Sequence, residues 1–209
     1  MPPRDNDQAG AWPQTQASDG QVTAAPGLAG EDTRIAEARA DFLAFYDREY
    51  EPVVRFVMRC GASLEAAEDA VQDAFVDAWA LTKRVDAWRA IAEPRGWIRR
   101  VAIRKYHRPP GKHRRPVTVP VADVPELPQP AGWRADLTDT TVSVLAALRR
   151  LHPEQQEAMA FHLDGFSGPE IASQLGITEQ KARDLIKAAR KVLRHDLARG
   201  PSPTKGAGQ

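Results

Sequence analysis

Cysteine is almost missing from this sequence, which has Cys60 alone among its 209 residues and so excludes an intramolecular disulfide. Cys60 falls on the apolar stripe of a predicted helix, where we expect a buried structural residue rather than a redox sensor. The five histidines are scattered and lack the spacing of metal ligands. The sequence also has no glycine-rich phosphate loop and no serine nucleophile motif. We therefore expect no catalytic activity, no cofactor and no metal site.

Long hydrophobic runs are missing too, since no apolar stretch approaches the roughly 20 residues that a membrane-spanning helix needs. A signal peptide has a basic start followed by an apolar run, and the first residues of this sequence lack that combination. Residues 1–33 are rich in small and polar residues and have few sizeable apolar side chains. Such a segment buries too little apolar surface to offset its ordering entropy, so we expect disorder there. These features predict a cytoplasmic protein without membrane insertion.

The net charge of +1 conceals two neighbouring segments of opposite sign. From Ser63 to Thr82 the chain has acidic residues and no basic one, whereas twelve basic residues lie between Lys83 and Arg115. A basic cluster of this size is a plausible binding surface for nucleic-acid phosphates. The alternative is a solvated charged face, but such faces usually mix charges of both signs.

The apolar spacing up to residue 106 predicts several amphipathic helices. One covers residues 41–60, with Pro52 arguing for a kink or for two helices meeting there. A second, capped by Ser63, covers residues 64 to about 85. After a break at residues 86–93, Pro94 begins a short helix whose arginines project from its non-apolar faces.

Seven prolines mark residues 107–135 as a linker, because proline disfavours regular helix and favours extended backbone. Helical spacing resumes at residue 136, with Leu137, Val144, Leu145, Leu148 and Leu151 on one face, and Pro153 opens a further helix. We expect residues 200–209 to form a loose tail. The predicted fold is therefore all-α. It has two small helical domains, residues 34–106 and 136–199, joined by the proline-rich linker.

Near the C-terminal end, residues 165–183 have the pattern of a helix-turn-helix. Ser167 and Glu170 form a capping box for the first helix, Gly176 suits the sharp turn, and Thr178 caps the second helix. The outward positions of the second helix are mostly basic: Gln180, Lys181, Arg183, Lys187, Arg190 and Lys191. An ordinary two-helix hairpin with a solvated basic face is the alternative interpretation of this segment alone.

Two blocks of the sequence resemble a bacterial RNA polymerase sigma factor, of the extracytoplasmic-function type of the sigma-70 family. Residues 67–79, AEDAVQDAFVDAW, are close to the family signature AEDLVQETF…AW and form the most specific motif. Residues 94–102, PRGWIRRVA, match the family helix PRAWLYRIA. The first block, residues 42–106, resembles sigma region 2. The second, residues 144–197, resembles region 4, and its opening LRRLHPEQQEA corresponds to LxxLPPxxREV.

The resemblance implies a set of site residues. The acidic helix would bind the clamp helices of RNA polymerase core enzyme through Glu68, Asp69, Gln72 and Asp73. The start-proximal promoter element would be bound by a basic set, in which Trp88 would stack on or wedge against exposed bases and the others would hold phosphates. That set is Lys83, Arg84, Trp88, Arg89, Arg95, Arg99, Arg100 and Arg104. The upstream element would be read by the recognition helix, through Thr178, Glu179, Gln180, Lys181, Arg183, Asp184 and Lys187.

The resemblance therefore predicts a non-enzymatic initiation factor whose partners are polymerase core, promoter DNA and an anti-sigma factor. Two departures from the family pattern leave alternatives open: the basic helix stops early, near Pro109, and Asp184 stands where small polar or basic residues are common. One alternative is a stand-alone helix-turn-helix regulator, although the acidic run has no use in a simple repressor. The other is a degenerate sigma-like interaction protein that no longer opens promoters.

Overall fold

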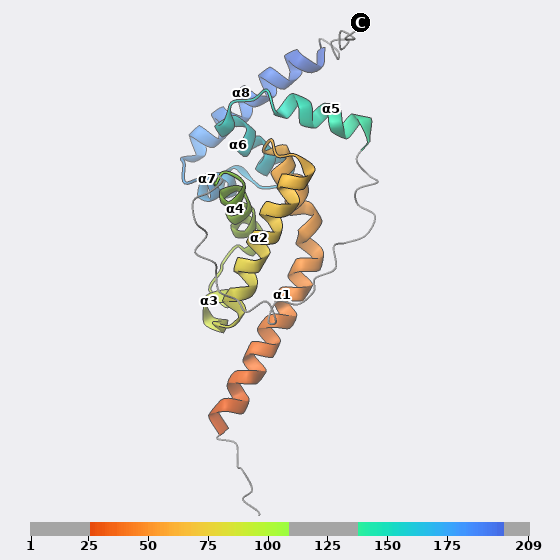
Figure 1. The fold of residues 1–209 in the computed structure, drawn as a ribbon. Helices are drawn as coiled ribbons and strands as arrows, with labels where there is room; N and C mark the ends of the chain where they lie inside the picture. The colour runs from red at the N-terminus through yellow and green to blue at the C-terminus, as the bar shows by residue number, and fades with distance from the viewer. Residues whose placement is uncertain (1–25, 109–137, 199–209) are drawn as a thin grey trace, which may run out of the picture.

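The computed structural model describes residues 26–108 and 138–198, and within them every regular element is an α-helix, as predicted. Eight helices follow one another in these residues (Figure 1). They are α1 (Pro26–Arg59), α2 (Leu64–Thr82), α3 (Val85–Arg89), α4 (Pro94–Tyr106), α5 (Asp139–Leu148), α6 (Pro153–Leu163), α7 (Gly168–Leu175) and α8 (Glu179–Ala198). Most of the predicted linker, and the segments 1–25 and 199–209, lie outside the described residues.

The long helix α1 begins earlier than the composition predicts. Residues 26–33, expected to be disordered, are helical, so that expectation is wrong for them. Two ion pairs fasten this half of α1 to α3: Arg34 lies 2.8 Å from Asp86, and Arg89 lies 3.2 Å from Glu37. Ile35 also packs against the core. The first turns nevertheless project beyond the other helices (Figure 1).

Pro52 does not divide α1. One continuous helix passes through this residue, so the alternative of two helices meeting there is wrong. A proline inside a helix removes one backbone hydrogen bond. Here the flanking side chains Tyr50, Val53 and Phe56 are fully buried, and their packing compensates for that loss.

The N-terminal domain packs α2, α3 and α4 against α1. The Ser63 hydroxyl caps α2 by accepting from the backbone N–H of Ala66 at 3.2 Å. All seven side chains predicted to face inward on α2 are buried: Ala67, Ala70, Val71, Ala74, Phe75, Ala78 and Trp79. Cys60 is buried as well, and burial raises the pKa of its thiol, as expected for a structural residue.

The segment expected to be a break, residues 86–93, in fact contains most of the short helix α3. Pro94 is the first residue of α4, as predicted, and α4 continues to Tyr106. His107 and Arg108, the first residues of the predicted linker, complete the turn that ends α4.

The C-terminal domain consists of α5 to α8. Leu145, Leu148 and Leu151 are buried as predicted, but Val144 is 42 % exposed, so its placement on the inner face is wrong. The reason is helical geometry, because Val144 is one residue before Leu145 and so lies about 100° around the helix from it. Pro153 occupies the first turn of α6, where it loses no helical hydrogen bond.

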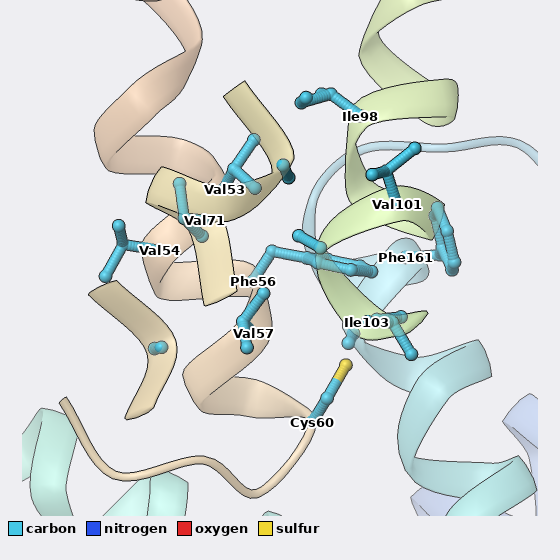
Figure 2. Close-up of a cluster of buried hydrophobic side chains, with 14 of the residues drawn as sticks. Val53, Val54, Phe56, Val57, Cys60, Val71, Ile98, Val101, Ile103 and Phe161 are labelled. Carbon is cyan, nitrogen blue, oxygen red and sulfur yellow. The ribbon is translucent and has the colours of Figure 1, made fainter. Parts of the chain in front are cut away.

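The two domains share one hydrophobic core. The rings of Phe56 in α1 and Phe161 in α6 lie 4.6 Å apart, centroid to centroid, and meet edge to face at 64°. Figure 2 shows Phe161 reaching toward Phe56, with Val101 and Ile103 of α4 beside them. All four side chains are buried. The linker therefore joins domains that pack directly against each other.

Candidate nucleic-acid interface

The turn before the recognition helix has the geometry that the sequence predicts. The Glu170 carboxylate accepts hydrogen bonds from the backbone N–H of Ser167 at 2.7 Å and from its hydroxyl at 2.6 Å, which completes the capping box. These hydrogen bonds hold the pKa of Glu170 below its usual value. Gly176 has φ of +66°, a left-handed conformation that glycine adopts without a side-chain clash. The Thr178 hydroxyl then accepts from the N–H of Lys181 at 3.2 Å and starts α8.

The predicted recognition residues all lie on the surface. Each of the seven is exposed: Thr178, Glu179, Gln180, Lys181, Arg183, Asp184 and Lys187. Gln180 donates to Asp184 at 3.1 Å, and Arg183 donates to Gln180 at 3.3 Å. Exposed contacts of this kind contribute little to stability, so DNA can replace them at low cost. The N-terminal half of α8 therefore presents its predicted recognition residues to solvent.

A basic groove extends this surface beyond the predicted residues. It encloses about 350 Å³ and is lined by His162, Gly168, Arg183, Ile186, Lys187, Arg190 and Arg194. Arg190 lies 2.6 Å from the His162 ring, and burial together with the Arg190 charge lowers the pKa of His162. Sequence reasoning did not place Arg194 in the site. The signal was present, because positions 183, 187, 190 and 194 follow one face of a helix.

The acidic face of α2 is also brought together as predicted. Asp69 and Gln72 are exposed, while Glu68 and Asp73 are half-buried beside them. The four residues occupy two adjacent turns, and no basic residue interrupts them.

The eight predicted promoter contacts of the N-terminal domain divide into two groups. Six of them are exposed: Lys83, Arg84, Arg89, Arg95, Arg100 and Arg104. Between the start of α1 and α3 lies a cleft of about 750 Å³, lined in part by Arg34, Lys83 and Arg84. Arg34 was missed because the sequence predicted no helix before residue 41, whereas α1 begins at Pro26. The remaining two predicted contacts, Trp88 and Arg99, are buried.

Trp88 does not lie on the surface, which corrects the expectation that it is exposed for stacking on bases. Its side chain is only 7 % exposed, and its ring lies 5.7 Å from the rings of both Phe42 and Phe45. The physical reason is that α3 has only five residues, and Val85 and Trp88 are the two that it buries. The indole supplies the apolar area that packs this short helix on α1. Trp97 is half-buried and packs against the core, as its place on the apolar stripe predicts.

Arg99 does not project from α4 toward solvent either, which corrects its expected exposure. Its side chain is 1 % exposed and is paired with two carboxylates, at Glu49 and Asp164. A guanidinium is buried only where carboxylates and carbonyls satisfy it, and this site supplies both. The carboxylate of Asp164 lies 65 residues further along the chain, so no local pattern identifies it.

The described residues contain no helix long and apolar enough to cross a membrane and no cluster of three or more potential metal ligands.

Comparison with known proteins matches both domains. The family model described as Sigma-70 region 2 matches residues 45–115, and the one described as Sigma-70, region 4 matches residues 141–193, together more than half of the chain. A similar solved structure is that of CnrH in complex with the cytosolic domain of CnrY. It is 22 % identical with a TM-score of 0.56, and the match covers 81 % of this chain and 98 % of that one. A search of curated protein sequences gave no significant match. The chain has regions 2 and 4 in order and a fold similar to that of CnrH, and it belongs to the sigma-70 family.

Proposed function

We propose that this protein binds RNA polymerase core enzyme and directs it to a subset of promoters, where it takes part in strand opening without catalysing a reaction itself. The observation that carries the proposal is the presence of two exposed surfaces of different kinds in one chain. The acidic face of α2 suits a basic protein surface, and the recognition helix α8 suits DNA. A regulator that only bound DNA would need the second surface alone.

In this proposal, polymerase docks on region 2 through the acidic face. Carboxylates at helical spacing form charge-assisted hydrogen bonds with arginines of a partner, and these bonds are shorter and stronger than neutral ones. Asp69 and Gln72 stand farthest into solvent and would make the first contacts. Glu68 and Asp73 complete the same face.

Promoter DNA would meet both regions. The exposed basic residues of region 2 would hold the backbone near the start site, where each phosphate contact adds affinity without sequence preference. Region 4 would insert the start of α8 into the major groove of the upstream element. Arg183 is the best placed residue for a base, because a guanidinium bonds a guanine edge in two places. Such a factor acts where polymerase and the chromosome are, in the cytoplasm.

The comparison extends this proposal to a regulatory partner. CnrH was solved in complex with the cytosolic domain of CnrY. We propose that this chain also has a protein partner, and that this partner is an anti-sigma factor.

A second function is favoured by one observation, the burial of Trp88 and Arg99. If neither side chain reaches DNA, the protein acts as a sigma-like interaction protein that binds polymerase without opening promoters. Both functions require binding to polymerase. They differ in whether the polymerase that carries this protein opens promoters and starts transcription.

Binding to core enzyme is tested by charge reversal on the acidic face. Asp69→Lys/Gln72→Lys should weaken the affinity for purified core enzyme at least about tenfold, or about 1.4 kcal/mol, because both new lysines face a basic partner. Asp41→Lys/Ala44→Lys is the matched control, since it makes the same charge change at the same spacing on exposed positions of α1. Equal affinity in the two double variants would remove the acidic face from the polymerase interface.

A further inference from the structure

The basic groove of region 4 contains a row of cations along one face of α8. The row consists of Arg183, Lys187, Arg190 and Arg194, at intervals of three and four residues. At 1.5 Å per residue, it extends for roughly 16 Å along the helix. Arg183 and Lys187 belong to the recognition residues that the sequence predicts, whereas Arg190 and Arg194 do not. The second half of the row therefore lies beyond the part of α8 that is expected to read bases.

The charge of this row is not balanced by acidic side chains. Among the described residues that line the groove, none is acidic. Arg183 pairs with Glu179 of its own helix at 3.5 Å. Within residues 26–108 and 138–198, no carboxylate forms an ion pair with Lys187, Arg190 or Arg194. Cations of one sign gathered along a groove attract an anionic ligand.

His162, in the last turn of α6, holds Arg190 in the groove. An Nη of Arg190 lies 2.6 Å from Nε2 of the His162 ring. A guanidinium can only donate, so the ring accepts this hydrogen bond and is neutral. Burial and the Arg190 charge lower the pKa of His162, which keeps the ring neutral near pH 7. A neutral acceptor fixes the direction of the guanidinium without cancelling its charge.

The rest of the groove leaves room beside these cations. Nε of Arg194 donates to the backbone carbonyl of Arg190 at 3.4 Å, so its side chain lies back along the row. Ile186 lines the groove and is 8 % exposed. Gly168, the first residue of α7, also lines it, and a Cβ at this position would meet no atom within 4 Å. A ligand can therefore approach the arginines past the start of α7.

We propose that the basic groove is a phosphate-binding site that holds the DNA backbone next to the bases read by α8, with Arg190 and Arg194 as phosphate ligands and His162 as the residue that positions Arg190. The inference rests on the proposed function, because it requires α8 to lie on DNA. Phosphate contacts fix the register and orientation of a protein on a duplex without carrying sequence information. The groove thus sets how α8 enters the major groove.

Continuity with the recognition face favours DNA as the anion. Arg183 and Lys187 line the groove and are also recognition residues, so a strand that they bind continues toward Arg190 and Arg194. A row of roughly 16 Å is longer than one phosphate group and suits a chain of them. Arginine also matches the geometry of a phosphate, since its planar fork can donate two parallel hydrogen bonds. The other anion of suitable length is an acidic segment of a protein partner.

Two neighbouring cations of α8 provide the first test. The full chain is titrated with a duplex of random sequence at several salt concentrations. Arg190→Ala and Arg194→Ala should each weaken binding several-fold and lower the salt slope by about one contact. Lys191→Ala is the matched control, because Lys191 is exposed on the same helix and does not line the groove. Its salt slope should stay close to that of the wild-type protein.

A second pair of variants changes the charge of the groove without removing a cation. Gly168→Glu places a carboxylate at the edge of the groove and should weaken DNA binding several-fold relative to Gly168→Gln. The two side chains have nearly the same shape, so any strain from replacing glycine before Pro169 is common to both. Circular dichroism should show equal helix content in the two variants.

The positioning role of His162 is tested by rescue and by a double variant. His162→Leu removes the acceptor and should weaken DNA binding, whereas His162→Gln keeps an acceptor oxygen and should restore most of the affinity. His162→Leu/Arg190→Ala should bind as weakly as Arg190→Ala alone, because His162 acts through that arginine. Independent, additive losses in the double variant would overturn the positioning role.

Equal salt slopes in Arg190→Ala and Lys191→Ala, with equal DNA affinity in Gly168→Glu and Gly168→Gln, would overturn the phosphate site. If the groove variants keep their DNA affinity and lose affinity for purified core enzyme, the groove takes an acidic protein segment and the proposal is wrong. If they lose DNA affinity as expected and the wild-type protein yields no transcript with core enzyme, the phosphate site stands and the proposed function fails.

Discussion

The ring of Phe161 in region 4 lies edge to face on the ring of Phe56 in region 2, 4.6 Å away between centroids. Neither ring has any exposed surface. Phe161 also contacts Phe166 at 5.2 Å, so it belongs to the core of its own domain and to that of its neighbour. This relationship predicts that the two regions unfold together.

Replacing Phe161 tests that shared core. Phe161→Ala should lower the free energy of unfolding by about 3–5 kcal/mol, because it removes a large buried ring and leaves a cavity. Urea unfolding followed by circular dichroism measures the loss. Leu163→Ala is the control on the same helix, since Leu163 is 48 % exposed and should cost far less. Two separate transitions in the wild-type protein would contradict a core common to both regions.

Trp88 should behave as a structural residue. Trp88→Ala should cost about 3–5 kcal/mol of stability, since it empties the space between Phe42, Phe45 and α3. Trp88→Phe keeps an aromatic ring there and should restore most of that stability. Thermal unfolding of both variants provides the measurement.

Measuring promoter opening by Trp88→Phe distinguishes two roles of the Trp88 indole, packing in the core and contact with a DNA base. If Trp88 only packs, permanganate reactivity of the opened strands should equal that of the wild-type protein once the variant is folded. Strong loss of opening by a stably folded Trp88→Phe would show that the indole leaves the core to meet a base.

Local patterns in the sequence predicted much of this fold. The spacing of apolar residues predicted α2 and its inner face, and the pair Ser167 and Gly176 predicted the boundaries of α7. These features depend on neighbours three or four residues away, which a sequence displays directly. The start of α1 was missed because its helix is held by ion pairs to α3, 52 residues further on.

Part of the candidate site could also be predicted, because it too depends on residues that are close in the sequence. The recognition residues are exposed as expected, because the face of an isolated amphipathic helix determines their position. Arg99 has the same local signature as its exposed neighbour Arg100. Contacts with Glu49 of α1 and with Asp164 of region 4 bury the first, whereas the second stays in solvent.

Two variants of the recognition helix distinguish a contact with a DNA base from a contact with a phosphate. Arg183→Ala should cost about 1–3 kcal/mol on a duplex carrying the functional upstream element and much less on unrelated DNA. Lys187→Ala should weaken binding to both duplexes alike and lower the salt slope by about one contact. Titrations of the two variants at matched salt give the comparison.

Arg183 also contacts Gln180 and Glu179 on its own helix, so a purely structural role is a defined alternative. An equal loss on both duplexes would make Arg183 a phosphate contact. No loss on either would remove it from the interface.

Run-off transcription with purified core polymerase on genomic fragments tests the central claim most directly. Discrete transcripts should appear from a subset of fragments when this protein is added, and none should appear with core enzyme alone. Asp69→Lys/Gln72→Lys should abolish those transcripts, whereas Asp41→Lys/Ala44→Lys should retain them. If the protein binds core enzyme tightly and yet no fragment yields a specific transcript, it does not act as a sigma factor, and the interaction protein is the correct assignment.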